Sequence, residues 1–133
     1  MNIWANRFVL GFMRGVLHVW FRFRGYNEEA AKCDGPVLLV PNHLSWIDWL
    51  FVGLCLGTDW KFAASGLQAR TSKLHAWILG NPRIILIDPD PAPALKKMAS
   101  HLEGGGKLVL FAEGRMSRTG SLQRLFDGTG FLI

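Results

Sequence analysis

His43 and Asp48 are five positions apart in a stretch that joins a predicted buried strand to a predicted helix. The strand covers Val37 to Val40, a Pro41-Asn42 break follows, and the helix runs from about Trp46 to Leu56. His43 therefore lies on the loop, and Asp48 lies in the first turn of the helix. A carboxylate that holds the Nδ1–H of an imidazole leaves Nε2 free to take a proton from an alcohol. The two residues are predicted to be a general base and its orienting acid.

The same stretch has a structural alternative, because Ser45 and Asp48 have the spacing of a capping box. Ser45 would stand at the N-cap, and Asp48 would accept hydrogen bonds from free N–H groups at the end that the helix dipole makes positive. A lone loop histidine is commonly a solvated residue without a role. The spacing by itself leaves capping and catalysis open.

Four predicted strands lack period-2 alternation and are separated by helices. The strands cover residues 37–40, 60–64, 84–87 and 107–111, and the helices between them cover residues 46–56, 67–79 and 93–102. This pattern predicts an α/β fold in which helices bury the sheet on both faces. Loops at the carboxyl ends of such strands bind ligands. We therefore expect His43 and the loop that begins at Phe111 to meet at one edge of the sheet.

A basic amphipathic helix is predicted before this fold, from Ile3 to Phe23. A narrow stripe at spacings of three and four holds Arg7, Gly11, Arg14, His18 and Arg22, with Gly15 beside it, and most of the rest of the helix is apolar. The longest stretch between arginines, Gly15 to Phe21, is far shorter than the roughly 20 apolar residues that span a bilayer. We expect residues 1–24 to lie in the membrane interface with the arginines toward the headgroups, and residues 25–133 to form the α/β domain. The alternative is a helix packed on the domain's own core.

Composition favours a membrane-associated protein of a reducing compartment. Half of the 133 residues are hydrophobic, and the formal charge of +5 suits phosphates or anionic lipid as partners, while nucleic acid is not expected. Cys33 and Cys55, with no C-x-x-C motif, argue against a disulfide framework or a zinc site, and no metal is expected. The cysteine content fits a reducing compartment, and we expect the protein at the cytoplasmic face of the inner (plasma) membrane. The chain ends in the apolar run Gly130 to Ile133, which suggests a C-terminal truncation of the domain.

Two segments carry a family resemblance. Asn42 to Asp48 and Phe111 to Arg115 resemble the paired H-x4-D and F-P-E-G signatures of the glycerophospholipid acyltransferases. The resemblance covers roughly Arg14 to Ile133. The continuation through Leu122, with Phe126 to Phe131, is most similar to the acyltransferase half of the bifunctional 2-acylglycerophosphoethanolamine acyltransferase/acyl-acyl-carrier-protein synthetases.

The resemblance implies a reaction that agrees with the acid–base interpretation. His43 would deprotonate the free glycerol hydroxyl of a lysophospholipid, and the oxygen would attack an acyl thioester of acyl carrier protein or coenzyme A. Asp48 would hold the imidazolium. Glu113, Gly114 and Arg115 would hold the headgroup, since glycine permits close backbone approach and arginine grips phosphate with two hydrogen bonds. No cofactor beyond the thioester co-substrate is implied.

Several positions depart from the family pattern. Ala112 replaces a proline, Arg115 and Met116 replace the commoner Thr-Arg, and Asp88 stands where many members have arginine. The loss of a phosphate-binding arginine favours lysophosphatidylethanolamine over lysophosphatidate as acceptor. Three alternatives stay open: a 1-acylglycerol-3-phosphate acyltransferase, a non-catalytic membrane-binding module, and a thioesterase in which the same base activates water.

Overall fold

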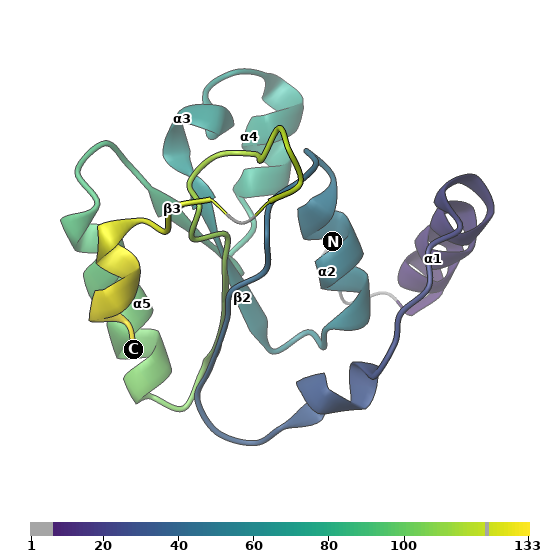
Figure 1. Ribbon diagram of the computed structural model, residues 1–133, viewed down its shortest axis with the longest axis horizontal. Coiled ribbons are helices and arrows are strands. Elements are labelled where there is room, and N and C mark those ends of the chain that lie inside the picture. The colour runs from purple at the N-terminus through teal and green to yellow at the C-terminus, as the bar shows by residue number, and fades with distance from the viewer. Residues whose placement is uncertain (1–6, 122) are drawn as a thin grey trace. The chain divides into compact units, whose positions relative to one another are not determined.

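The computed structural model describes residues 7–121 and 123–133, and the chain divides into two compact units. The first unit combines the segment that ends at Asp34 with Trp46–Thr58, and the second combines Gly35–Ser45 with Asp59–Ile133. The elements of the first unit are α1 (Arg7–Phe21), the 3-10 helix η2 (Glu28–Lys32) and α2 (Asp48–Cys55). Those of the second are β1 (Val37–Leu39), β2 (Trp60–Ser65), α3 (Gly66–Ala69), α4 (Lys73–Leu79), β3 (Ile84–Ile87), α5 (Ala92–Glu103), β4 (Lys107–Leu110) and the 3-10 helix η3 (Asp127–Phe131) (Figure 1).

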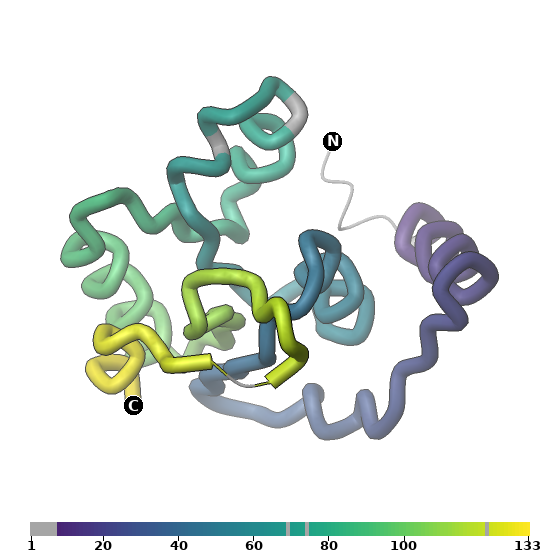
Figure 2. Tube along the Cα trace, turned by 45° about the horizontal axis from the view of Figure 1, so that its top comes forward, coloured from purple at the N-terminus to yellow at the C-terminus, as the bar shows by residue number. Residues whose placement is uncertain are grey.

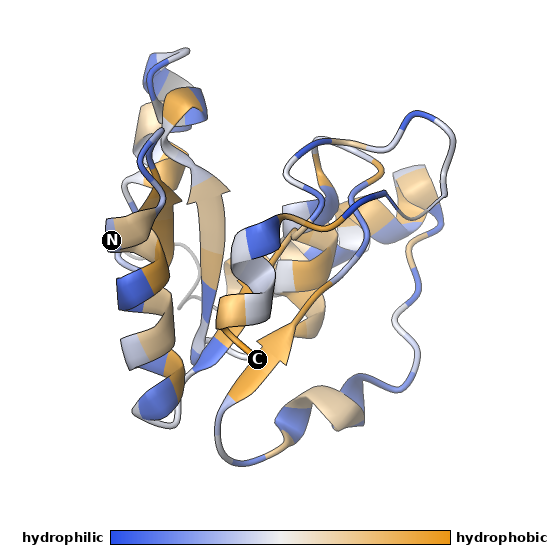
Figure 3. Ribbon diagram, turned by 60° about the vertical axis from the view of Figure 1, so that its left-hand side comes forward, coloured by the Kyte–Doolittle hydropathy of each residue, from blue (hydrophilic) through white to orange (hydrophobic). Residues whose placement is uncertain are grey.

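The second unit is built on a parallel sheet with strand order β1-β4-β2-β3. Strand β4 lies between β1 and β2, with Lys107 in register with Val37 on one side and Trp60 on the other. Its residues Leu108 and Val109 have no exposed surface. The strands are mostly hydrophobic, as Figure 3 shows. The predicted α/β class is therefore confirmed, and the structure adds that the sheet is parallel.

Helix α5 covers one face of this sheet. Ala94, Met98 and Leu102, four residues apart, form its buried stripe and pack with Leu108 in the core. Full burial of a side chain such as that of Met98 stabilises the fold by about 1.5–3 kcal/mol. The trace in Figure 2 shows η3 returning beside α5. Burial of the second face of the sheet stays a prediction.

Two predicted helices differ in the structure. The helix expected from Leu67 to Leu79 is two helices, α3 and α4, because polar side chains between them take up backbone groups. The Thr71 hydroxyl donates to the Gln68 carbonyl at 2.8 Å, and Ser72 caps α4 by accepting a hydrogen bond from the His75 N–H at 3.2 Å. From Asp127 onward the sequence also predicts a helix, and the structure has the short 3-10 helix η3 there.

In the first unit, the polar side of α1 is engaged with its own neighbours. Arg14 forms an ion pair with Glu28 and donates to the Leu54 carbonyl at 3.4 Å, and the hydrogen bond that the guanidinium donates to Glu28 raises the pKa of Arg14. Phe23 stacks on Phe51 with ring centroids 5.3 Å apart. Arg14, predicted to face lipid headgroups, is thus held within its own unit. The predicted helix start at Ile3 lies outside the described residues.

The opposite side of α1 is apolar and open. Its exposed side chains are Phe8, Phe12, Val16, Val19 and Trp20. Among the described residues, no helix has both the length and the hydropathy to cross a membrane. The helix is amphipathic, with an exposed apolar surface.

An ion pair at the start of β4 makes stability depend on pH. Lys107 Nζ lies 2.8 Å from Asp59 Oδ2, and this hydrogen bond holds the pKa of Asp59 below its usual range. A carboxyl group whose pKa is lower in the folded than in the unfolded chain stabilises the fold at pH values above the unfolded-state pKa. This stabilisation is lost as the pH falls through the folded-state pKa. We expect Asp59→Asn to lower the free energy of unfolding by about 0.5–1 kcal/mol at neutral pH. Urea unfolding at pH 7 should show this difference, and a series toward pH 2 should show it disappear.

The two cysteines should differ in reactivity. Cys33 is exposed, whereas Cys55 at the end of α2 is partly buried, and burial followed by the nearby Glu28 charge raises the pKa of its thiol. Because the thiolate is the reactive form, Cys33 should react with Ellman's reagent roughly tenfold faster or more. Stopped-flow traces of the Cys33→Ser and Cys55→Ser proteins would assign the two phases. Equal rates would contradict the burial of Cys55.

Candidate functional site

The structure brings the His43 loop and the Phe111 loop together at the carboxyl edge of the sheet. His43 is half-buried on the loop after β1, and Phe111 directly follows β4. Their rings are 4.6 Å apart between centroids and tilted by 34°. The contact arises because β1 and β4 are neighbours in the sheet. The expectation that these two loops meet at one edge is confirmed.

A backbone hydrogen bond joins the same two loops. The Ser117 N–H donates to the His43 carbonyl at 2.7 Å, and the Ser117 hydroxyl donates to the Ser121 carbonyl at 2.9 Å. Ser117 itself is only 8% exposed. The sequence did not indicate a role for Ser117. Its contact with His43 is made by the backbone N–H, which every residue except proline carries, so no residue pattern could have predicted it. Ser117 and Phe111 therefore constrain the backbone and the ring of the candidate base.

Glu113 is a buried carboxylate beside this junction. It is 6% exposed, and neither carboxylate oxygen has a hydrogen-bond partner among the described residues. The preceding Ala112 is almost fully buried, and its carbonyl accepts a hydrogen bond from Phe126 N–H at 2.7 Å, which holds the start of the loop against the returning chain. An unpaired buried carboxylate is costly to the fold. Such a cost is commonly found at functional sites.

Gly114 allows the loop to turn immediately after Glu113. Its φ of 63° lies in the left-handed region, which favours glycine, and its N–H donates to the Phe111 carbonyl at 3.2 Å. A Cβ at this position would meet no atom within 4 Å, so the turn, and not a close approach by the protein, requires glycine. Arg115 follows on the exposed part of the turn. The loop thus presents a cation to solvent next to a buried carboxylate.

Asp48 is the first residue of α2, with Ile47 at the N-cap. The predicted N-cap at Ser45 is therefore wrong, and the Asp48 carboxylate lies in the first turn, where the helix dipole favours it. Asp48 belongs to the first unit and His43 to the second. Their pairing stays a prediction.

Asp88, at the end of β3, is engaged with its neighbours. Asp88 Oδ1 lies 3.7 Å from the Arg70 guanidinium. The same oxygen is so close to the buried Gly66 that a Cβ added there would be only 2.6 Å from it. The acidic side chain is thus exposed where β2 and β3 end, close to Arg70 and Gly66. A carboxylate here repels phosphate instead of binding it.

The second unit can therefore present an imidazole, a buried carboxylate and an exposed guanidinium at one edge of its sheet. Across residues 7–121 and 123–133, no three His, Cys, Asp or Glu side chains are grouped as a metal site requires. Such an arrangement suits proton transfer and the binding of a polar or anionic group.

Comparison with known protein families agrees with this chemistry. The family model described as Acyltransferase matches residues 22–133. The matched range contains all four strands of the sheet and both loops at its carboxyl edge.

Proposed function

The chain belongs to the acyltransferase family, matched over residues 22–133, and we propose that it moves a fatty acyl group from a thioester to the free glycerol hydroxyl of a lysophospholipid. The preferred acceptor in this proposal is lysophosphatidylethanolamine, and the donor is an acyl carrier protein or coenzyme A thioester. The observation that carries the proposal is the junction of the His43 and Phe111 loops, made by the Ser117 N–H and the Phe111 ring.

In this proposal, His43 acts as the general base. Its imidazole takes the proton from the glycerol hydroxyl, and the oxygen attacks the thioester carbonyl to form a tetrahedral intermediate. The intermediate collapses to the new ester and expels the thiolate, which takes the proton back from the imidazolium. Asp48 stabilises the imidazolium while it exists. Base catalysis of this kind contributes about 10²–10⁴ in rate.

The loop from Glu113 to Arg115 binds the acceptor in this proposal. The exposed Arg115 suits a phosphodiester, which it can contact through two hydrogen bonds. The buried Glu113 carboxylate has acceptor capacity that no described residue uses, so it suits the hydroxyl or ammonium of the acceptor. Asp88, which pairs with Arg70, supports an acceptor other than a bare phosphate monoester.

Membrane association is part of the same proposal, because a lysophospholipid resides in a bilayer. The exposed apolar side chains of α1, which include Phe12 and Trp20, support an interfacial position for this helix. Arg14 does not contribute to headgroup contacts in this arrangement, since it is held by Glu28. The cytoplasmic face of the inner membrane is the location proposed.

A headgroup panel tests the assignment. The purified protein should acylate lysophosphatidylethanolamine faster than lysophosphatidate or lysophosphatidylcholine, with radiolabelled acyl carrier protein and coenzyme A thioesters supplied in parallel. A clear preference for lysophosphatidate would identify a 1-acylglycerol-3-phosphate acyltransferase. Release of free fatty acid without an acceptor would identify a thioesterase, and vesicle binding without turnover would identify a non-catalytic membrane module.

A further inference from the structure

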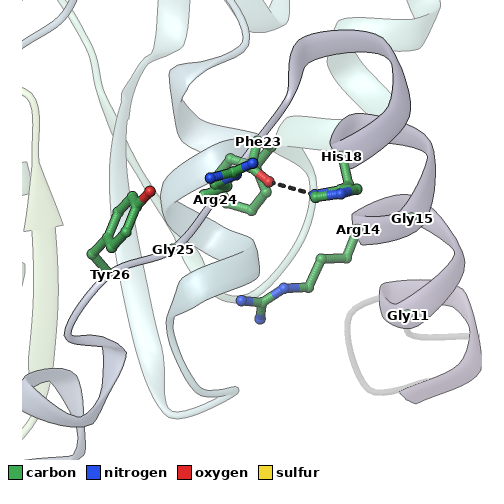
Figure 4. A pocket seen from close by; sticks show the side chains of 8 residues that line it. All are labelled: Gly11, Arg14, Gly15, His18, Phe23, Arg24, Gly25 and Tyr26. Carbon is green, nitrogen blue, oxygen red and sulfur yellow. Dashed lines mark hydrogen bonds between the residues drawn. The ribbon is translucent and has the colours of Figure 1, made fainter.

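Helix α1 and the segment after it line a shallow, open groove of about 640 Å³ within the first unit (Figure 4). One wall is the stretch of α1 between Gly11 and Gly15, which lie one turn apart. A Cβ at either glycine would meet no atom within 4 Å, so this wall is bare backbone beside open space. The chain from Phe23 to Tyr26 forms the facing wall. The groove can therefore admit a ligand close to the helix backbone.

Basic side chains line this groove. Arg14, His18 and Arg24 all contribute to it, and Figure 4 shows His18 on α1 and Arg24 on the segment after the helix. Arg14 shares its charge with Glu28, whereas Arg24 forms no ion pair with any residue that the structure describes. His18 Nδ1 donates to the Phe23 carbonyl at 2.9 Å, which ties the two walls together. The groove thus has an uncompensated arginine beside a histidine, a combination that favours an anion.

An uncommon backbone conformation produces the facing wall. Arg22, directly after α1, has a φ of 52° in the left-handed region, which non-glycine residues rarely adopt. The turn lets the Phe23 N–H donate back to the Leu17 carbonyl at 3.3 Å and sets Arg24 alongside the helix. Sparsely populated conformations of this kind are concentrated at ligand-binding and functional sites.

The border of the groove is apolar. Phe12 and Val19 lie three and four residues from Gly15, so they neighbour the glycine edge on the helix surface. They are 73% and 75% exposed. Inorganic phosphate would make no apolar contact with this border. A phospholipid carries its phosphate next to hydrocarbon chains, which can pack on the border.

We propose that this groove binds the phosphate of a membrane phospholipid, with Arg24 on the phosphate, His18 holding the two walls together, and the acyl chains along Phe12 and Val19. The bound lipid is not a substrate; it holds α1 at the bilayer surface. The inference rests on the membrane association proposed above, and it does not depend on acyl-transfer chemistry.

The test is a titration of the ¹⁵N-labelled full chain, followed by NMR. Dihexanoylphosphatidylglycerol, kept below its micelle-forming concentration, should shift the amide signals of Gly11, Gly15 and Gly25 in a saturable way. Shifts confined to Gly114 and its neighbours would place the lipid at the acyl-transfer site only and would overturn the inference, while leaving the proposed function intact. Inorganic phosphate that produced the same shifts with equal affinity would overturn the assignment to a lipid. Octyl glucoside serves as an amphiphile without phosphate and should not produce them.

Two matched pairs of variants separate a built site from general attraction to a membrane. Arg24→Gln should weaken binding of the short-chain lipid about tenfold or more. Lys97→Gln removes the same charge from the exposed side of α5 and should leave binding unchanged. Gly15→Leu should block the groove, whereas the smaller side chain of Gly15→Ala should leave lipid binding unchanged. Both alanine and leucine favour a helix, so α1 should fold in both variants. Attraction through apolar surface alone predicts the reverse, because the added leucine would strengthen binding. Equal effects of Arg24→Gln and Lys97→Gln, or tighter binding by Gly15→Leu, would refute the site.

Discussion

Replacing His43 with alanine should lower the rate of acyl transfer by about 10²–10⁴-fold, because the acceptor hydroxyl loses its general base. The Ser117 bond to His43 is made through the backbone carbonyl, so the alanine protein keeps this junction of the two loops. The ring contact with Phe111 is lost. Single-turnover assays with a fixed thioester donor should therefore show a loss in the chemical step. Thermal unfolding of the same protein should show a far smaller change.

A matched control and a double variant make this prediction specific. His75→Ala removes a histidine from α4, whose ring hydrogen-bonds to Ser72, and it should leave acyl transfer nearly unchanged. Asp48→Asn should slow the reaction, and the His43→Ala/Asp48→Asn protein should be no slower than His43→Ala alone, since residues that act as a unit are not additive. Independent, multiplying losses would show that Asp48 does not act through His43. Near-normal turnover by His43→Ala would rule out the base assignment.

Replacing Glu113 with leucine should stabilise the protein and at the same time impair acyl transfer. The carboxylate is buried without a described hydrogen-bond partner, so leucine of similar size removes a desolvation cost of about 1–3 kcal/mol. The acceptor loses a charged hydrogen-bond partner, which should reduce kcat/KM about 10–100-fold. Opposite changes in stability and activity are typical of residues that serve a ligand at the expense of the fold.

Urea unfolding and steady-state kinetics on one protein sample test both parts of this prediction. Glu103→Leu, at the exposed end of α5, is the control and should give neither effect. Glu113→Gln keeps the shape and polar atoms of the side chain, so it should gain less stability than leucine. A destabilised Glu113→Leu protein with normal kinetics would show that the carboxylate serves the fold and does not bind the acceptor.

Local patterns were sufficient to predict most of the second unit. Continuous apolar runs between turn residues predicted all four strands to within one residue at each end, because an apolar strand needs burial wherever it lies in a sheet. The helix over α3 and α4 was predicted as one element, since its apolar spacing continues across Thr71 and Ser72. The helix breaks because these two hydroxyls form hydrogen bonds with backbone groups of Gln68 and His75, and hydropathy does not predict such bonds.

The first unit shows a different limit. The sequence pattern correctly indicated an amphipathic α1, but it grouped Arg14 with residues that face lipid headgroups. Glu28, fourteen positions later, pairs with Arg14, and the turn at Arg22 brings the chain back along the helix. A charge on a helical stripe can be satisfied by solvent, by lipid or by a distant carboxylate. Periodicity does not distinguish among them.

The chemical groups at the site, the class of the fold and the placement of His43 and Glu113 after apolar strands could all be predicted from the amino-acid sequence. These follow from side-chain chemistry and from hydrophobic periodicity, which are local properties. Only the tertiary structure decided that β1 and β4 are neighbours, that Ser117 bonds to the His43 carbonyl and that Glu113 is buried without a described partner. These features depend on strand order and on backbone groups that every residue carries. Residue identity therefore could not reveal them before the chain was folded.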